Sequence, residues 1–211
     1  MRLFSYIVAR DFGFAPNPFY GWCTLATCKP EIRRSAQVGD WVIGTGAKTK
    51  YDLAGRLVYA MQVGETLDFR AYWDDPRFSC KRPILNGSLK QVYGDNIYTR
   101  TRGRWRQADS HHSLEGGRQN SRNIARDTRV NRVLVAERFV YFGNSAPVIP
   151  RTFRPPARAG AAICCVRQGH KIHDDDVALA FEKWLLTRNN WGVQGMPLEF
   201  ARHARVAPRS R

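Results

Sequence analysis

The sequence is short of acidic residues and has no long apolar run. Of its 211 residues, 18 are Asp or Glu and 34 are Lys or Arg, which gives a formal net charge of +16. A surface with this imbalance attracts polyanions, of which nucleic acid is the commonest, although excess charge can also serve solubility alone. No apolar stretch approaches the roughly 20 residues of a membrane-spanning helix. We therefore expect nucleic acid as a partner, DNA foremost, and no membrane.

The sequence also lacks the signatures of the common cofactor and metal sites. It contains no Walker loop, no dinucleotide-binding fingerprint and no G-x-S-x-G motif. Its cysteines are odd in number and form no repeated C-x-x-C pair, so they indicate neither a disulfide framework nor a zinc site. We expect no metal, no cofactor and a reducing, cytoplasmic location. The cysteines are Cys23, Cys28, Cys80, Cys164 and Cys165.

Strand and helix patterns alternate along the chain and predict an α+β fold. VGDWVIGTG at 38–46 and GRLVYAMQV at 55–63 read as an antiparallel strand pair. A hairpin is expected with its turn at 101–103, where Gly103 supplies the required freedom. Apolar residues at the helical period, preceded by three aspartates, predict an amphipathic helix over 174–188.

The length and composition favour one domain. A chain that is 43% hydrophobic can build one substantial core. We place this domain at 1–200. The tail at 201–211 carries four arginines and no acid, so we expect it to be disordered.

Two groups of side chains are candidates for function. A carboxylate beside an imidazole can tune a general base, and adjacent histidines could serve as base and phosphate contact. The alternative is that the Asp and Ser side chains here only form hydrogen bonds with the backbone of their own turns.

Arginines on the arms of the hairpin, and on the basic stripe at 118–132, are placed to contact phosphates. The catalytic candidates are Asp95, Asp109, His111 and His112, and the phosphate contacts are Arg100, Arg104, Arg106 and Arg122.

Long stretches of the sequence resemble the nucleotide modification associated domain 2 family. The resemblance covers nearly the whole chain, and it implies a setting in the DNA modification systems of bacteria and phages, without a settled activity. It is carried by SYIVARDFGFAPNPFYGWCTLATCKPEIRR at 5–34, VGDWVIGTG at 38–46, YWDDPRF at 72–78, LNGSLKQVYGDNIY at 85–98, DSHHSLEGG at 109–117, YFGNSAPVIP at 141–150 and GMPLEF at 195–200.

A second likeness is architectural. The helical turn before Val38-Gly39-Asp40 and the two following strands are similar to PUA-like barrels of the EVE, ASCH and YTH type. That likeness implies a β-barrel, or a strongly curved mixed sheet, with short flanking helices. It also implies an aromatic pocket for one modified or flipped base, although the polar insert at 95–127 departs from a minimal barrel. The implied pocket residues are Asn17, Trp22, Trp41, Thr45, Asn96 and Tyr98.

Three functions remain open at this point. The chain is expected to bind nucleic acid and recognise a modified or flipped base. Alternatively, it is an enzyme that acts on nucleic acid or nucleotides through the aspartate and histidine cluster. A third possibility is an accessory subunit that binds a protein partner in a modification or restriction system. The sequence alone does not decide whether there is catalysis.

Overall fold

The computed structural model describes residues 1–48, 52–154, 156, 160–165 and 169–201. The chain divides into two compact units, each assembled from segments that are separated in sequence. Unit 1 comprises Met1–Phe12, Gly39–Gln62 and the described part of Arg138–Arg211, and unit 2 comprises Gly13–Val38 and Val63–Glu137.

Unit 1 is built on a six-stranded mixed sheet. Strand β1 runs parallel to β3, and β9 runs parallel to β11, while the other neighbouring pairs are antiparallel. The pairing of β3 with β4 confirms the antiparallel pair predicted from the sequence. In spatial order the strands are β10 (His170–His173), β1 (Leu3–Val8), β3 (Trp41–Gly46), β4 (Leu57–Gln62), β9 (Phe139–Tyr141) and β11 (Gly192–Val193).

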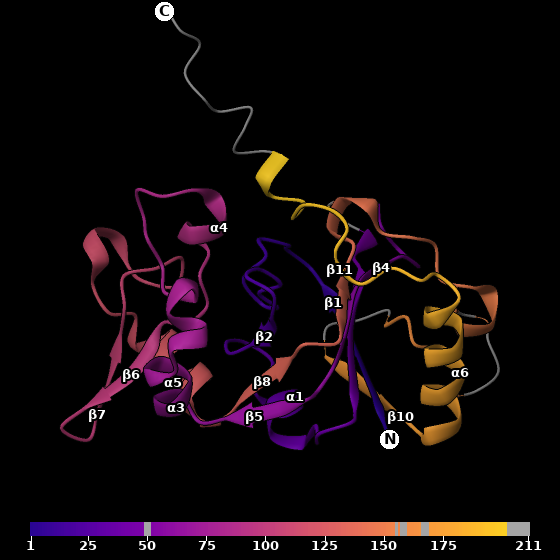
Figure 1. Cartoon of the computed structure of the whole chain (residues 1–211), viewed down its shortest axis with the longest axis horizontal. Coiled ribbons are helices and arrows are strands. Elements are labelled where there is room, and N and C mark those ends of the chain that lie inside the picture. Colours follow the sequence, from indigo (N-terminus) through magenta and orange to yellow (C-terminus); the bar gives the residue numbers. More distant parts are fainter. Residues whose placement is uncertain (49–51, 155, 157–159, 166–168, 202–211) are drawn as a thin grey trace, which may run out of the picture. The chain divides into compact units, whose positions relative to one another are not determined.

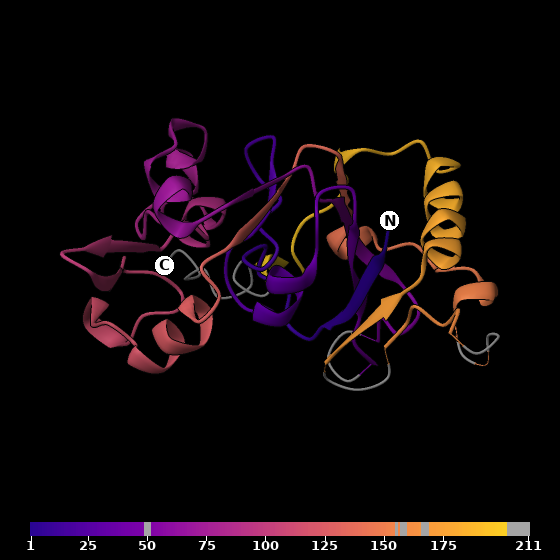
Figure 2. The same cartoon turned by 90° about the horizontal axis from the view of Figure 1, so that it is seen from below.

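Helix α6 (Asp175–Leu186) lies alongside this sheet in both views (Figures 1 and 2). Phe181 on its buried face meets Trp41 of β3 edge to face, with ring centroids 6.1 Å apart. Asp174 is the N-cap residue, and two further aspartates occupy the first turn, where the helix dipole favours negative charge. The predicted amphipathic helix is therefore confirmed. Two short 3-10 turns, Gly143–Ser145 and Arg151–Phe153, complete unit 1.

Unit 2 holds a smaller antiparallel sheet with short helices and a hairpin. The sheet has the order β2 (Cys23–Leu25), β8 (Val133–Ala136) and β5 (Glu65–Leu67). The helices are α1 (Pro30–Ser35), α3 (Phe69–Asp74), α4 (Leu89–Val92) and α5 (Ser121–Thr128), with 3-10 turns at Pro76–Lys81 and Glu115–Gly117.

The hairpin joins β6 (Tyr98–Thr101) to β7 (Arg104–Gln107), and its tip projects from unit 2 in Figures 1 and 2. Arg102 and Gly103 have φ of 49° and 76°, so both central residues of the turn lie in the left-handed region. This is the backbone that tight hairpins require. The predicted hairpin is confirmed, but its turn is one residue shorter than the predicted 101–103, because Thr101 pairs with Arg104 at the end of the ladder. The register sets Arg100 opposite Trp105.

The structure shows the predicted mixed α+β class with a six-stranded mixed sheet, but it does not confirm the PUA-like barrel. The described strands form an open sheet whose edge strands, β10 and β11, do not pair with each other. The edge strand β11 has two residues, too few for a ladder that closes a barrel. The prediction of a disordered tail falls on 202–211, outside the described residues, and the prediction of one domain at 1–200 stays a prediction. Within the described chain, no helix has the length and apolarity to cross a membrane.

Candidate functional site

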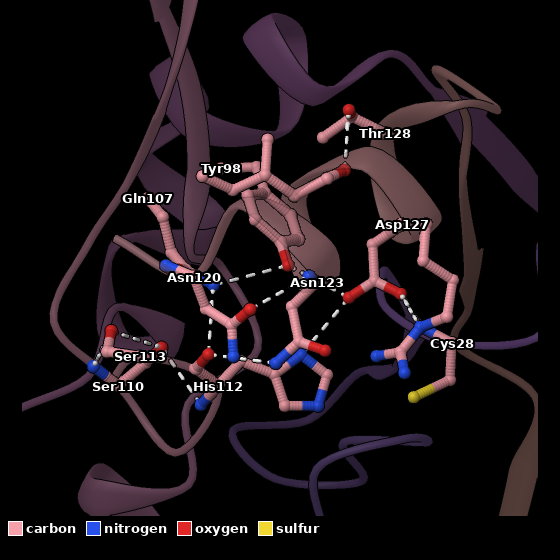
Figure 3. A network of polar contacts seen from close by, with 12 residues as sticks. Cys28, Tyr98, Gln107, Ser110, His112, Ser113, Asn120, Asn123, Asp127 and Thr128 are labelled. Atoms are coloured by element: carbon pink, nitrogen blue, oxygen red, sulfur yellow. Dashed lines mark hydrogen bonds and ion pairs between the residues drawn. The ribbon is translucent and has the colours of Figure 1, made fainter. Parts of the chain in front are cut away.

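The polar centre of unit 2 is the carboxylate of Asp127, which is fully buried in the last turn of α5 (Figure 3). Its Oδ2 atom accepts a hydrogen bond from the Tyr98 hydroxyl at 2.9 Å and contacts His112 Nδ1 at 3.1 Å. Its Oδ1 atom accepts from the backbone N–H of Cys28 and from Arg126 Nε, each at 3.1 Å. Because both oxygens are occupied, the carboxylate is held in one orientation.

The backbone around His112 is held as firmly as its ring. Its carbonyl oxygen accepts from Asn123 Nδ2 at 2.9 Å and from Gln107 Nε2 at 3.3 Å, and its N–H donates to Ser110 Oγ at 3.3 Å. Asn123 belongs to the same helix as the buried carboxylate, so α5 positions both the imidazole and its partner. Figure 3 shows these contacts converging on the histidine from three segments.

Opposite charges in this cluster stabilise each other. Burial opposes the charged forms, but hydrogen bonds from His112 and Arg126 outweigh it and lower the pKa of Asp127 to about 2. Burial would also lower the pKa of His112, but its hydrogen bonds to Asp127 and Cys28 raise that pKa to about 9. At neutral pH the pair is therefore a carboxylate and an imidazolium.

Arg33 ties together the two backbone segments that carry the cluster. Its buried guanidinium donates from Nε to the Cys28 carbonyl at 3.0 Å and from Nη1 to the Val130 carbonyl at 2.7 Å. A further bond reaches the carbonyl of Asp127. Burial lowers the pKa of Arg33 to about 10, which still leaves it charged at neutral pH. The backbone of Cys28 is thus held through both its N–H and its C=O.

The catalytic candidates taken from the sequence separate in the structure. His112 has its carboxylate partner, but the partner is Asp127 and not Asp95 or Asp109. Asp109 packs against Gly117 in the turn that follows β7. His111 is exposed, with its ring 5.6 Å from that of Phe14.

Asp95 belongs to a second buried network around Lys81. The ammonium of Lys81 donates to Asn17 Oδ1 at 2.6 Å, to the Asn17 carbonyl at 3.0 Å and to the Trp22 carbonyl at 2.9 Å. Asp95 accepts from Thr24 Oγ1 and from the hydroxyl of Tyr72, both at 2.8 Å. Burial lowers the pKa of Lys81 to about 8 and raises that of Asp95 to about 6.

The six residues of the expected base pocket fall in both units. In unit 1, Trp41 packs in the core against α6, and Thr45 Oγ1 donates to the Tyr6 carbonyl at 3.3 Å. In unit 2, Trp22 is half-buried and packs edge-on against Phe78. Five of the six are at most 1% exposed: Asn17, Trp41, Thr45, Asn96 and Tyr98.

The four expected phosphate contacts, Arg100, Arg104, Arg106 and Arg122, are all exposed in unit 2. The guanidinium carbon of Arg100 lies 4.4 Å from the centre of the Trp105 ring, its partner across the hairpin. Both line a cavity of about 440 Å³ together with Arg70 and Arg102. We call this the hairpin cleft; it is lined by Asp68, Arg70, Arg100, Arg102, Gly103, Trp105 and Asn131.

The sequence analysis did not identify several residues that the structure places in the candidate sites. Asp127 is the sole acid among the five arginines of 118–132, a signal that could have marked it as a buried partner. Arg70 and Arg102 gave no comparable signal, because their convergence depends on how α3 packs against the hairpin. Elsewhere in the described residues, no group of three or more His, Cys, Asp or Glu side chains is arranged to hold a metal ion.

Comparison with known proteins identifies the family of the chain. The family model for nucleotide modification associated domain 2 matches residues 1–204, which confirms the resemblance found in the sequence. No curated protein matches the chain. No solved structure matches it either.

Proposed function

Because the chain belongs to the nucleotide modification associated domain 2 family, we propose that it serves a nucleotide modification system by binding nucleic acid through the hairpin cleft. The observation that carries the proposal is the convergence of Arg70, Arg100 and Arg102 around the indole of Trp105. Cations supply affinity for phosphates, and aromatic rings supply surfaces on which bases stack.

The cleft is pre-organised for such a ligand. The Trp105 ring packs edge to face against the Phe69 ring, with the two ring centroids 5.5 Å apart. Arg100 is held over the indole, and a guanidinium held flat in this way can bind a phosphate or stack on a base at little cost in entropy. The wall holds three arginines and one acid, Asp68, whose Oδ1 accepts from Ala71 N at 2.7 Å. The arginines therefore dominate the charge that faces a ligand.

We further propose that the protein prefers a modified or flipped base. Extruding a base costs a few kcal/mol, which stacking and phosphate contacts can offset. The preference is measured by comparing affinities for matched duplexes with and without a modified base, at equal salt. Equal affinity for the two duplexes would leave a nucleic-acid-binding protein without base recognition.

Replacing both Arg100 and Arg102 with alanine should weaken binding to every DNA sequence alike. If each arginine neutralises one phosphate, the slope of log affinity against log salt should fall by about 2. The control is Lys183→Ala with Arg188→Ala, two exposed positions of unit 1 that remove the same charge. Fluorescence anisotropy on one short duplex measures both proteins. An equal loss in the two double variants would mean that only net charge matters.

Replacing Trp105 with alanine should weaken binding about 5-fold to 150-fold, the magnitude of one lost stacking contact. The variant removes no charge, so the salt slope should stay that of the wild type. The same anisotropy titrations, extended to single-stranded DNA, provide the measurement. Affinity within twofold of wild type would exclude the indole from the binding surface.

A further inference from the structure

Three reactive groups meet in unit 2 outside the hairpin cleft: the thiol of Cys28, the imidazole of His112 and the carboxylate of Asp127. Nδ1 of the imidazole lies 3.1 Å from the carboxylate, and the Cys28 side chain is near enough to the ring to affect its charge. In Figure 3 the second ring nitrogen faces the side on which the cysteine sulfur lies. The order is thiol, imidazole, carboxylate, which is the order of a nucleophile, its base and the group that orients the base.

Each member is held by contacts that preserve this order. Asp127 also accepts the backbone N–H of Cys28, so one carboxylate positions both the imidazole and the residue that carries the sulfur. With Nδ1 directed at the carboxylate, Nε2 is the nitrogen left to exchange a proton with the thiol. Cys28 has φ of 55°, a left-handed backbone that is unusual for a residue with a side chain.

Cationic side chains surround Cys28. Arg126 and Arg33 both interact electrostatically with Cys28, and His112 adds a third cation. The groups that face the imidazole are Asp127 from α5, Cys28 itself, and the rings of Phe14 and His111, whose centroids lie 4.6 Å and 5.8 Å from that of His112. Cys28 is half-buried, whereas Cys23 on the adjoining strand is fully buried. Cations beside a partly exposed thiol are the environment of reactive cysteines.

We propose that Cys28 is the nucleophile of an acyl-transfer site, with His112 as its acid and base and Asp127 as a positioning residue. In the fraction of molecules whose His112 is neutral, the thiol proton passes to Nε2 as sulfur bonds to the carbonyl carbon of an ester or amide. The C–O or C–N bond then breaks, and the leaving oxygen or nitrogen takes that proton from His112. Water, deprotonated by the same nitrogen, cleaves the thioester, releases the acid and restores the thiol. No oxidant or reductant is needed.

The first test compares Cys28 with Cys80, which is exposed and serves as an internal reference. Because the proposal makes Cys28 the nucleophile, we expect iodoacetamide at pH 6 to alkylate Cys28 about tenfold faster than Cys80. Peptide mass spectrometry resolves the two sites in one sample of the full chain. His112→Gln should remove the advantage. Equal or slower reaction at Cys28 of the wild type overturns the proposal, even if the variant fails to fold.

The second test addresses the acyl class. p-Nitrophenyl acetate should give a burst of one nitrophenol per chain and leave one acetyl group on Cys28, with no burst in Cys28→Ser. Alkylation without acetylation at Cys28 would overturn the acyl assignment. Acetylation that is as fast in His112→Gln as in the wild type would overturn the role of the histidine.

Discussion

Replacing Lys81 with methionine is expected to destabilise unit 2 by about 3–5 kcal/mol, the cost of breaking a buried, fully hydrogen-bonded charge. The ammonium is 0% exposed and satisfies three acceptors on Asn17 and Trp22. Methionine fills a similar volume but donates no hydrogen bond, so three buried oxygens lose their donor. Urea unfolding followed by tryptophan fluorescence measures the loss.

Lys183→Met is the matched control, because it makes the same chemical change at an exposed position of α6. It should change the free energy of unfolding by less than about 0.5 kcal/mol. A double variant, Lys81→Met with Asp95→Asn, isolates the electrostatic part, since Lys81 acts on Asp95 as a nearby charge. The double loss should be smaller than the sum of the single losses. A loss below about 1 kcal/mol in Lys81→Met would show that the network adds little to stability.

Elements that are local in sequence were predictable because their signals are local. The hairpin turn required two left-handed residues in succession, and Gly103 marked the position. The N-terminus of α6 was marked by its aspartates, and the β3–β4 pair by Gly39-Asp40 before a strand and a short connection. In each case the residues that determine the element lie within about one turn or one strand of it.

Pairings between distant segments were not predictable from the same signals. Strand β1 pairs with β10, so Leu3 lies opposite His173 at the far end of the sequence. The barrel was expected because one strand pair resembles those of PUA-like barrels. The sequence of that pair carries no information about which strands form the edges of the sheet.

The candidate site follows the same rule. Asp95 and Asp109 were the carboxylates predicted to orient a histidine, because they lie in the same polar stretch of the sequence. The structure instead uses Asp127, 15 residues after His112, because α5 returns its last turn to the histidine. The contact with Cys28 spans 99 residues and depends on the fold of unit 2 as a whole. The sequence identified His112 as a candidate by its residue type. Its neighbours Asp127 and Cys28 could be identified only from the tertiary structure.

Replacing Asp127 with asparagine should cost about 3–5 kcal/mol at neutral pH, because it leaves the buried imidazolium of His112 without its counter-ion. Asparagine keeps the shape of the side chain, but its amide end cannot accept from the donors that now converge on the carboxylate. Urea unfolding at pH 7 measures the loss. The Arg70→Ala variant, at an exposed position of the same unit whose ion pair with Asp74 lies on the surface, is the control that should change little.

The same variant should change the pH dependence of stability. The pKa of His112 is raised to about 9 from its ordinary 6.5, so its stabilisation is complete below pH 6.5 and is lost as the pH rises through 9. Integrated over that window the loss is on the order of 3 kcal/mol. Asp127 has its pKa lowered to about 2 from 3.8, so its contribution is present above pH 3.8 and is lost as the pH falls through 2.

Asp127→Asn should abolish both components, because the neutral amide cannot titrate and no longer holds the proton on His112. Lys81 titrates in the opposite sense above pH 8, but it does so in both proteins. The quantity to measure is therefore the difference in unfolding free energy between wild type and variant at several values between pH 6 and 10. That difference should shrink steadily as the pH rises, because the wild type loses the ion pair that the variant never had. A difference that stays constant with pH would mean that Asp127 stabilises the fold through its hydrogen bonds alone.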